Sequence, residues 1–262
     1  MKKKTVIIGG VAAGASAAAR LRRRDQQMEI VIFERGPYIS YANCGLPYYV
    51  GDVIQDRSDL LLQTPGMMKK RFDIDVRVLH EVTGIKPGEK KVVVKNLESG
   101  ETFEEAYDKL LIATGSSPIK PPLEGIDGKN IFTLWTVPDT EEIKAFLERE
   151  KPRSAVVIGG GFIGLEMAEN LHRAGVSVTL VEMQKQVMAP LDYEMAQLLH
   201  QNMDLNGVEL LLGDGVKRFY EEGAKTRVEL SGGRVLTTDM VILSIGVRPN
   251  SQLAGEAGLA IS

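Results

Sequence analysis

The same succession of segments occurs twice in this 262-residue sequence, and it restricts the possible folds more than any other feature. Each copy has a short apolar run, a glycine-rich turn, a helix-forming run, a second apolar run and then an acidic residue. The first glycines of the two turns, Gly9 and Gly159, lie 150 residues apart. This order is typical of a βαβ unit that binds a dinucleotide, with the pyrophosphate at the helix N-terminus. The sequence therefore predicts an α/β chain with two copies of one nucleotide-binding unit.

The first copy departs from the pattern at one position. Its middle glycine is replaced by Val11, and the neighbouring Gly10 is a candidate for relieving the crowding. Glu34 follows Gly14 by 20 residues, where a carboxylate can accept hydrogen bonds from ribose hydroxyls. The expected elements are a strand at 5–8, a helix at about 15–24 and a strand at 29–34. The candidate cofactor contacts are Gly9, Val11, Ala12, Ala13, Gly14, Glu34 and Arg35.

The second copy has all three glycines of the pattern. Glu182 ends its second strand, and a carboxylate there favours a free ribose 2′-hydroxyl over a 2′-phosphate, hence NADH over NADPH. Lys185 lies close enough to leave NADPH open. Phe162 and Glu166 are either nicotinamide contacts or ordinary packing and helix-surface residues. The expected elements are a strand at 154–158, a helix at about 165–174 and a strand at 177–181. The candidate contacts are Gly159, Gly161, Phe162, Ile163, Gly164, Glu166 and Glu182.

The remaining segments complete the two units. The β-rich runs at 76–95, broken by the turn signal at 86–89, and a strand at 101–105 predict an antiparallel meander. A strand ending in Ala113, Thr114 and Gly115 leaves the sheet beside the first cofactor, and a matching strand ends at Gly246. The predicted domains are 1–118 (first nucleotide-binding domain), 119–150 (connector), 151–246 (second nucleotide-binding domain) and 247–262 (start of a return to the first).

Composition excludes several classes of function. A net charge of −3 and a pI near 5.8 give no electrostatic reason to expect nucleic acid or an anionic membrane as a partner. No run of about 18 apolar residues predicts a membrane span. The basic start and apolar run at 1–19 resemble a secretory signal, but its glycines fit the nucleotide-binding turn better. The single cysteine fits a reducing cytoplasm. The histidines His80, His172 and His200 show no ligand spacing, are interpreted as surface or packing residues, and indicate no metal site.

The single cysteine, Cys44, lies within the stretch Ser40–Tyr49. A lone cysteine is by default a small buried hydrophobe. Here, however, Pro47 suits the first turn of a helix, and a thiol beside a helix N-terminus is favoured as the nucleophilic thiolate. The short distance from Glu34 predicts that the thiol lies at the edge of the sheet that holds the first cofactor. We predict a redox role in which Cys44 forms a mixed disulfide, a persulfide or a sulfenic acid, because no second cysteine is available.

Arginines close the helix expected at 15–24. Arg20, Arg23 and Arg24 share one face because they are three and four residues apart. One interpretation is a solvated helix end, with cations near the negative end of the helix dipole. The other is a binding face for the phosphates of a large anionic substrate.

The order of these motifs resembles that of the flavin-dependent pyridine nucleotide–disulfide oxidoreductases over essentially the whole sequence. Within them, residues 9–16 together with 40–48 are similar to the coenzyme A-disulfide and CoA-persulfide or polysulfide reductases. The resemblance implies a glutathione-reductase-type fold with two Rossmann-like domains, FAD on the first and NADH or NADPH on the second. It also implies a homodimer in full-length relatives. The family's second flavin motif and C-terminal dimerisation domain do not occur in these residues, so we interpret the sequence as a partial chain.

The resemblance also implies a reaction. Electrons would pass from NAD(P)H through FAD to Cys44, which would reduce a CoA disulfide, CoA persulfide or polysulfide. Ser40 and Asn43 would orient the substrate. Arg20, Arg23 and Arg71 would hold the CoA phosphates. Two alternatives stay open: an NADH oxidase or peroxidase that uses a Cys44 sulfenic acid, and a non-catalytic nucleotide-binding fragment.

Overall fold

The computed structural model describes residues 3–261, which form two compact units. The first unit comprises the chain up to Ala42, Ser58–Ser117 and the chain from Pro249 onward. The second comprises Asn43–Arg57 and Pro118–Arg248. Two short connecting strands, β8 (Ser116–Pro118) and β17 (Val247–Pro249), pair with each other.

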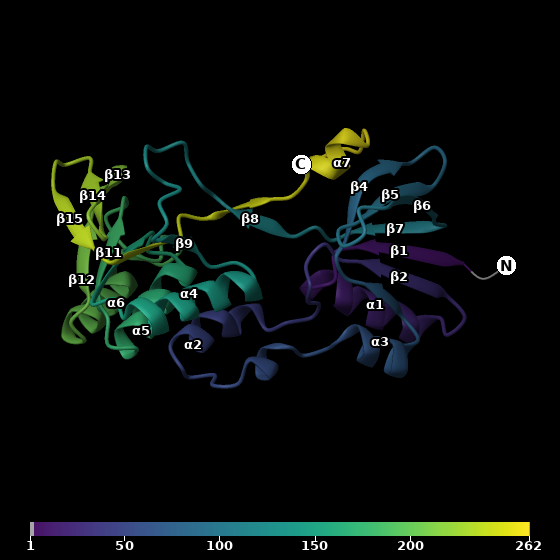
Figure 1. Cartoon of the computed structure of the whole chain (residues 1–262), viewed down its shortest axis with the longest axis horizontal. Coiled ribbons are helices and arrows are strands. Elements are labelled where there is room, and N and C mark those ends of the chain that lie inside the picture. The colour runs from purple at the N-terminus through teal and green to yellow at the C-terminus, as the bar shows by residue number, and fades with distance from the viewer. Residues whose placement is uncertain (1–2, 262) are drawn as a thin grey trace. The chain divides into compact units, whose positions relative to one another are not determined.

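The first unit is built on a four-stranded parallel sheet with the order β3-β2-β1-β7 (Figure 1). Its central strand is paired in register with both neighbours, Val6 opposite Val31 on one side and Leu110 on the other. The elements of this unit are β1 (Lys4–Ile8), α1 (Ala12–Arg24), β2 (Glu29–Phe33), α3 (Pro65–Phe72), β3 (Asp75–Arg77), β4 (His80–Lys86), β5 (Lys91–Asn96), β6 (Thr102–Ala106), β7 (Lys109–Ile112) and α7 (Gln252–Glu256).

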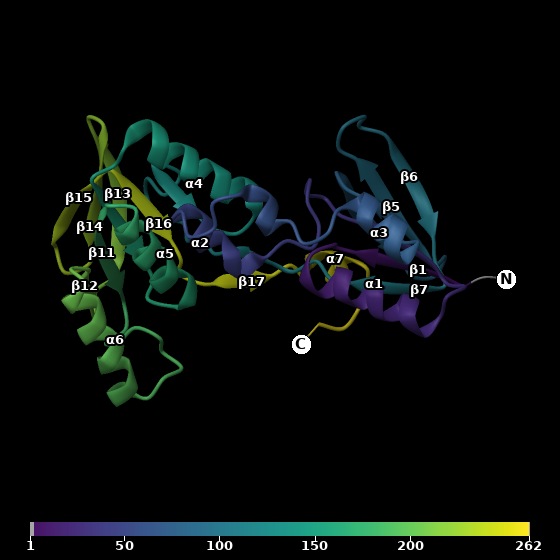
Figure 2. The same ribbon diagram turned by 90° about the horizontal axis from the view of Figure 1, so that it is seen from below.

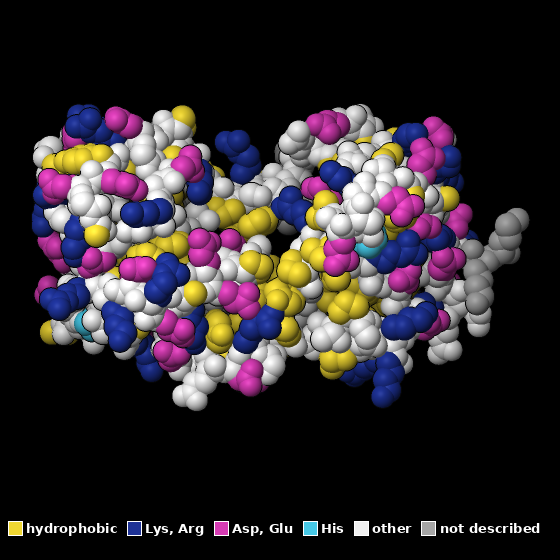
Figure 3. All heavy atoms as spheres, viewed as in Figure 1, with side chains coloured by type: hydrophobic (Ala, Val, Ile, Leu, Met, Phe, Trp, Pro, Cys, Tyr) yellow, Lys and Arg dark blue, Asp and Glu magenta, His cyan; other side chains and the backbone are white. Residues whose placement is uncertain are grey.

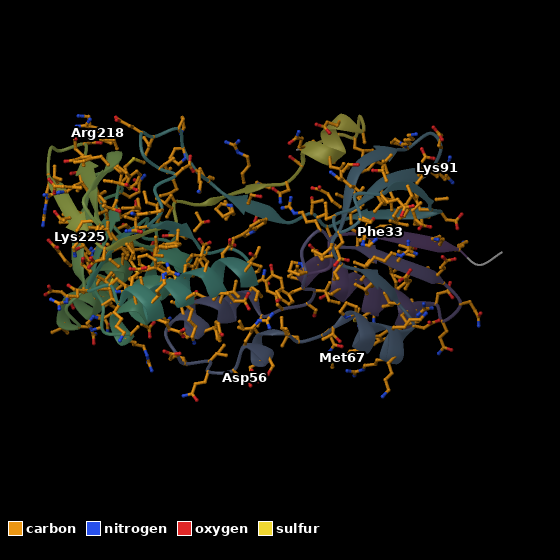
Figure 4. The ribbon with its side chains drawn as sticks, in the orientation of Figure 1. Phe33, Asp56, Met67, Lys91, Arg218 and Lys225 are labelled. Carbon is orange, nitrogen blue, oxygen red and sulfur yellow. The ribbon has the colours of Figure 1, made fainter. Side chains whose placement is uncertain are left out.

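Alternation along the strands sends side chains to two separate layers. Val6, Ile8 and Phe33 pack against the antiparallel sheet β4-β5-β6. Phe33, labelled in Figure 4, lies in this layer with Phe103, their ring centres 6.2 Å apart. Ile7 and its neighbours on the opposite face pack against α1 and α3, which lie together below β1 and β2 in Figure 1 and are seen from that side in Figure 2. The predicted meander is therefore present and covers one face of the first sheet.

The second unit repeats this plan. Its five-stranded parallel sheet has the order β12-β11-β10-β16-β9, and an antiparallel sheet β13-β14-β15 covers one face. The elements are α2 (Leu46–Val50), β9 (Ile131–Thr133), α4 (Val137–Glu150), β10 (Ser154–Ile158), α5 (Phe162–Arg173), β11 (Ser177–Glu182), α6 (Tyr193–Leu205), β12 (Glu209–Leu212), β13 (Val216–Glu222), β14 (Lys225–Leu230), β15 (Val235–Thr238) and β16 (Met240–Leu243).

The structure differs from the sequence-based expectation at the helix starts. α1 begins at Ala12 instead of Ala15, and α5 begins at Phe162 instead of Leu165. The reason is that Gly14 and Gly164 are not turn residues: each lies buried inside its helix. β9 falls within 119–150, the stretch predicted as a connector, because a three-residue strand is too short to show a periodicity. α4 lies in the same stretch, where the sequence predicts an amphipathic helix at 139–150.

Neither unit carries a helix suited to crossing a bilayer, as judged over residues 3–261. On the face shown in Figure 3, positively and negatively charged side chains are interspersed over both units. This distribution agrees with the small net charge of −3.

Candidate functional site

The glycine turn of the first unit admits no side chain at two positions. Gly9 has φ +98°, and a Cβ built on it would lie 2.2 Å from the carbonyl oxygen of Ala113. A Cβ on Gly14 would lie 1.8 Å from the carbonyl oxygen of Gly9. Real atoms do not approach this closely, so α1 can pack against the end of β1 only if both residues are glycine.

The second unit reproduces this geometry closely. Gly159 has φ +104°, and its Cβ would lie 2.5 Å from the carbonyl oxygen of Ser244. A Cβ on Gly164 would lie 1.9 Å from the carbonyl oxygen of Gly159. Ser244 therefore takes the place that Ala113 has in the first unit, and its hydroxyl also donates to the carbonyl of Ile158 at 2.9 Å.

The two turns differ at the middle position of the pattern. Gly161 has φ −79°, and a Cβ on it would meet nothing within 4 Å. Val11 stands at the equivalent position with φ −90°. Gly161 is extended and Val11 also has a negative φ, so neither position needs the left-handed backbone that favours glycine. The protein itself therefore does not require glycine at Gly161. Gly10 does not provide the relief considered above, because its missing Cβ points toward Ile39, at 2.7 Å.

Both fingerprint helices start without a side-chain cap among residues 3–261. Val11 precedes α1 and Gly161 precedes α5, and neither position supplies a side chain that accepts a hydrogen bond from the first turn. In contrast, Thr64 caps α3, and Thr136 forms a reciprocal capping box with Asp139 on α4. The first amide groups of an uncapped helix are unpaired donors at the positive end of its dipole, and this arrangement suits a pyrophosphate.

The two acidic residues act as braces before any ligand binds. Glu34, which is 9% exposed, accepts hydrogen bonds from the amides of Gly10 and Gly36, both at 2.7 Å. Glu182 accepts from the amides of Gly160 at 2.6 Å and Gln184 at 2.7 Å. An ionised carboxylate has about four lone-pair positions, so each can still accept from a ribose hydroxyl. The sequence-based reasoning missed the roles of Gly10 and Gly160, although the repeated Gly-Gly pair was a visible signal.

A left-handed residue links each acidic strand back to its glycine turn. In the first unit Ser40, at φ +44°, donates its amide to the carbonyl of Gly10 at 3.0 Å. In the second unit Met188, at φ +49°, donates to the carbonyl of Gly160 at 2.8 Å. We call these two contacts the first and second latch. The fully buried residues before them, Ile39 and Val187, pack on the same two glycines. The repeat therefore extends beyond the predicted fingerprint.

The Ala-Thr-Gly strand end of the first unit is held by Asn250. The hydroxyl of Thr114 donates to the Asn250 carbonyl at 2.6 Å, and the Asn250 side-chain amide donates to the Thr114 carbonyl at 2.9 Å. The Asn250 backbone amide donates to the carbonyl of Gly115 at 2.9 Å. Gly246, the matching glycine of the second unit, has φ +114°. Asn250 is thus a structural partner of this strand end.

Cys44 is exposed, so it is not the buried hydrophobe that a lone cysteine is by default. It lies with Asn43 in a 3₁₀ turn, Asn43–Gly45, which leads directly into α2. As predicted, Pro47 stands in the first turn of that helix. The turn and α2 belong to the second unit, whereas Ser40 belongs to the first.

Contacts within the second unit fix α2. Lys144 of α4 donates to the carbonyl of Tyr49 at 3.1 Å and pairs with Asp52 at 2.6 Å. Gly51, which ends α2, lies so close to α5 that a Cβ would approach the side-chain oxygen of Asn170 to 2.4 Å. The segment that carries Cys44 is therefore anchored to two helices, one of which carries the second glycine turn.

Comparison with known proteins identifies the family. The family described as "Pyridine nucleotide-disulphide oxidoreductase" matches residues 3–262. The chain belongs to this family.

Individual relatives agree with the assignment to this family. The coenzyme A disulfide reductase of Staphylococcus haemolyticus is 33% identical over 99% of the chain, and an NADH oxidase of Methanocaldococcus jannaschii is 34% identical over 98%. Among solved structures, the reduced CoADR-RHD of Bacillus anthracis has a TM-score of 0.97 and 54% identity over 100% of the chain. A NAD-dependent persulfide reductase from A. fulgidus has a TM-score of 0.94 and 38% identity over 99%.

The chain spans only part of these proteins. It covers 57% of both named relatives, 47% of the CoADR-RHD chain and 49% of the persulfide reductase chain.

The predicted phosphate-binding arginines lie on two helices, α1 and α3, that are tied together. Arg22 of α1 donates to the carbonyls of Phe72 at 2.7 Å and Asp73 at 3.0 Å, at the end of α3. This anchor, which the sequence analysis had not selected, brings the ends of the two helices side by side. The predicted phosphate-binding residues, all exposed, are Arg20, Arg23 and Arg71.

The residues beside the second glycine turn are accessible. Phe162 is 67% exposed, so it is not a packing residue within the unit, and Ile163 is 37% exposed. Glu166 is half-buried, and burial together with the neighbouring Glu169 raises its pKa. The charge of Glu166 in turn is the main cause that raises the pKa of Tyr48 on α2.

The other predicted contacts keep the places that the motif gives them. Ala12 and Ala13 form the exposed first turn of α1, and Arg35 is exposed directly after Glu34. Within residues 3–261 no cluster of three or more histidine, cysteine, aspartate or glutamate side chains is arranged to hold a metal.

Proposed function

We propose that this chain supplies the two nucleotide cradles and the reactive thiol of a flavin-dependent NADH oxidoreductase that reduces a CoA-based disulfide or persulfide. The observation that carries the proposal is the duplicated cradle: two glycine turns with the same forbidden Cβ positions, the same carboxylate brace and an uncapped helix. The single exposed cysteine adds the group on which sulfur chemistry can take place.

The residues present fit two dinucleotides. In the first cradle, Gly9 and Gly14 would bring α1 to the pyrophosphate of FAD, and Glu34 would accept from its ribose. In the second, Gly161 leaves open space over α5 for the pyrophosphate of NADH. Glu182 would accept from the ribose 2′-hydroxyl and would repel a 2′-phosphate, so NADH is favoured over NADPH. FAD, when bound, supplies the chemistry that converts a hydride from the nicotinamide into electrons for sulfur.

Cys44 would carry the substrate through a mixed disulfide. Its thiolate attacks one sulfur of the substrate disulfide, a Cys44–substrate bond forms, and the other half leaves as a thiolate. Two electrons and a proton then cleave that bond, which restores the Cys44 thiolate and releases the second thiol. Asn43 and Ser40 would orient the substrate. Arg20, Arg23 and Arg71 would pair with CoA phosphates.

The similarity to an NADH oxidase supports a second candidate. In that reaction Cys44 would cycle through a sulfenic acid and would reduce oxygen or peroxide instead of a disulfide. The exposure of Cys44 suits this chemistry equally well. A homodimer and a cytoplasmic location are part of the main proposal, by analogy with full-length family members.

Substrate competition tests the proposal. The chain is supplied with FAD and NADH, and turnover is measured with CoA disulfide, CoA persulfide, glutathione disulfide and hydrogen peroxide, with Cys44→Ser as the control. We expect the CoA substrates to be reduced fastest and Cys44→Ser to be inactive with them. Equal rates with CoA and glutathione disulfides would remove the CoA assignment, and faster turnover of peroxide would favour the oxidase candidate. A chain that never acquires the visible absorbance of bound flavin would favour the non-catalytic alternative.

A further inference from the structure

The second latch has a support that the nucleotide-binding pattern does not include. Met188 is tied to Gly160, and the residue before it, Val187, is fully buried. The Val187 amide therefore cannot reach water, and it donates to Nε2 of His200 on α6 at 3.1 Å. His200 had been interpreted from sequence as a surface or packing residue.

This hydrogen bond fixes the protonation state of His200. Nε2 can accept an amide proton only if it carries none itself, so the ring is neutral with its proton on Nδ1. Protonation at Nε2 would place two N–H groups against each other. The buried amide of Val187 would then lose its partner, and an unpaired buried amide is costly.

We propose that His200 is a positioning residue for the second cradle: its neutral ring holds Val187 and thereby Met188 against Gly160, and its protonation loosens the latch and weakens NADH binding. The binding part of this inference rests on the proposed function, whereas the loosening of the latch does not. No contact between His200 and the nucleotide is required.

The electrostatic surroundings set the direction of the pH effect. Burial lowers the pKa of His200 below its ordinary value of 6.5, and among the described residues no charge adds to this cause. A released loop exposes the ring, which then binds a proton more readily. The latch is therefore complete above pH 6.5 and is lost as the pH falls through the lowered pKa. The ionisable groups on the neighbouring elements are Glu182 and Lys185 beside the loop, Glu194 and Asp204 on α6, Glu209 on β12, and Glu166, Glu169, His172 and Arg173 on α5.

The first latch provides an internal control. Backbone hydrogen bonds hold Ser40: the amide of Leu62 donates to its carbonyl at 3.1 Å, and the amide of Ala42 donates to the carbonyl of Leu60 at 2.8 Å. These groups do not titrate. The first cradle should therefore keep its latch over the pH range in which the second loses it.

Two substitutions distinguish the role of His200 as a hydrogen-bond acceptor from the effect of its protonation. His200→Gln keeps an acceptor that stays neutral at low pH, whereas His200→Phe keeps a ring but removes the acceptor. The first readout is the protection of the Val187 and Met188 amides against hydrogen exchange in the full chain, relative to Ser40. The second is the Kd for NADH. Both are measured from pH 7.5 to 5.5, and circular dichroism verifies that each variant is folded.

In the wild type, we expect acidification to reduce protection at Val187 and NADH affinity by roughly tenfold, about the effect of one lost buried hydrogen bond. His200→Gln should abolish this pH dependence, and His200→Phe should show the loss already at pH 7.5. The same acid response in His200→Gln and the wild type would overturn the inference. If NADH does not bind at any pH, the proposed function fails, while the exchange data still decide whether His200 holds the latch.

Discussion

The two nucleotide cradles of this chain have the same residue type wherever the backbone geometry requires it. They differ at positions where the backbone sets no such requirement. Both require glycine at the first and last positions, because a Cβ at Gly14 or Gly164 would lie less than 2 Å from a carbonyl oxygen. Both use a carboxylate to bind the amide of the second glycine. They differ at the middle position, which is Val11 in the first and Gly161 in the second. They also differ in the hydrogen bonds that support their latches.

This comparison separates two reasons for a glycine in the pattern. Gly164 is needed for the fold, since its Cβ would collide with the protein itself. Gly161 is not, since nothing lies within 4 Å of its missing Cβ. Under the proposed function, the free space at Gly161 would be occupied by the nucleotide. Val11 would then require a different approach of the nucleotide in the first cradle, and experiments on paired positions test this interpretation.

The largest expected effect comes from the last glycine. Gly164→Ala places a methyl group 1.9 Å from the Gly159 carbonyl, which forces α5 away from β10. We expect the free energy of unfolding to fall by about 2–4 kcal/mol. Chemical denaturation measures this loss. Gly161→Ala is the matched control and should cost less than about 1 kcal/mol. Equal losses in the two variants would contradict the separation between fold and ligand glycines.

The stability lost on replacing a carboxylate brace should increase with the burial of that carboxylate. Each carboxylate oxygen of Glu34 accepts one amide, and Glu34→Gln replaces one of these oxygens by an N–H₂ donor that faces an amide N–H. Because Glu34 is 9% exposed, we expect a loss of about 2 kcal/mol. Glu182→Gln, at a more exposed site, should lose about 1 kcal/mol. The free energies of unfolding of both variants test this order, and a larger loss at Glu182 would show that burial does not control it.

Much of this architecture was predictable from sequence. The strands before the glycine turns, the meander and the two acids were all placed by local patterns such as β-branched runs and the 20-residue step from Gly14 to Glu34. The carboxylate braces and the latches were not predictable from sequence, because the partner of Gly10 lies 24 residues away and the φ of Ser40 depends on tertiary contacts. His200 carried no motif, since its role depends on one amide 13 residues earlier.

Exchanging the middle residues tests the ligand side of the comparison. Gly161→Val copies the first cradle into the second and fills the space above α5 with a branched side chain. We expect NADH affinity to fall by roughly tenfold or more while the free energy of unfolding stays within about 1 kcal/mol. The Kd for NADH, measured by fluorescence titration, decides the outcome. Unchanged affinity would mean that the pyrophosphate does not lie over Gly161.

The smallest effect concerns the sheets themselves. β16 is fully buried between β10 and β9, whereas β7 is half-exposed and has β1 as its one strand partner among residues 3–261. Amides at a sheet edge open more readily than central ones. We expect faster hydrogen exchange at Leu111 than at Ile242, the equivalent residues of the two strands. Equal protection would show that the edge of the first sheet is covered in solution.

The central claim is that electrons from NADH reach Cys44 when both cradles are filled. The most direct test starts from chain in which Cys44, its one cysteine, carries CoA as a mixed disulfide. FAD and NADH are added without oxygen, and released CoA and the mass of the chain are measured. We predict release of one CoA per chain, dependent on both FAD and NADH. CoA that stays on Cys44 although both nucleotides are bound would contradict the account.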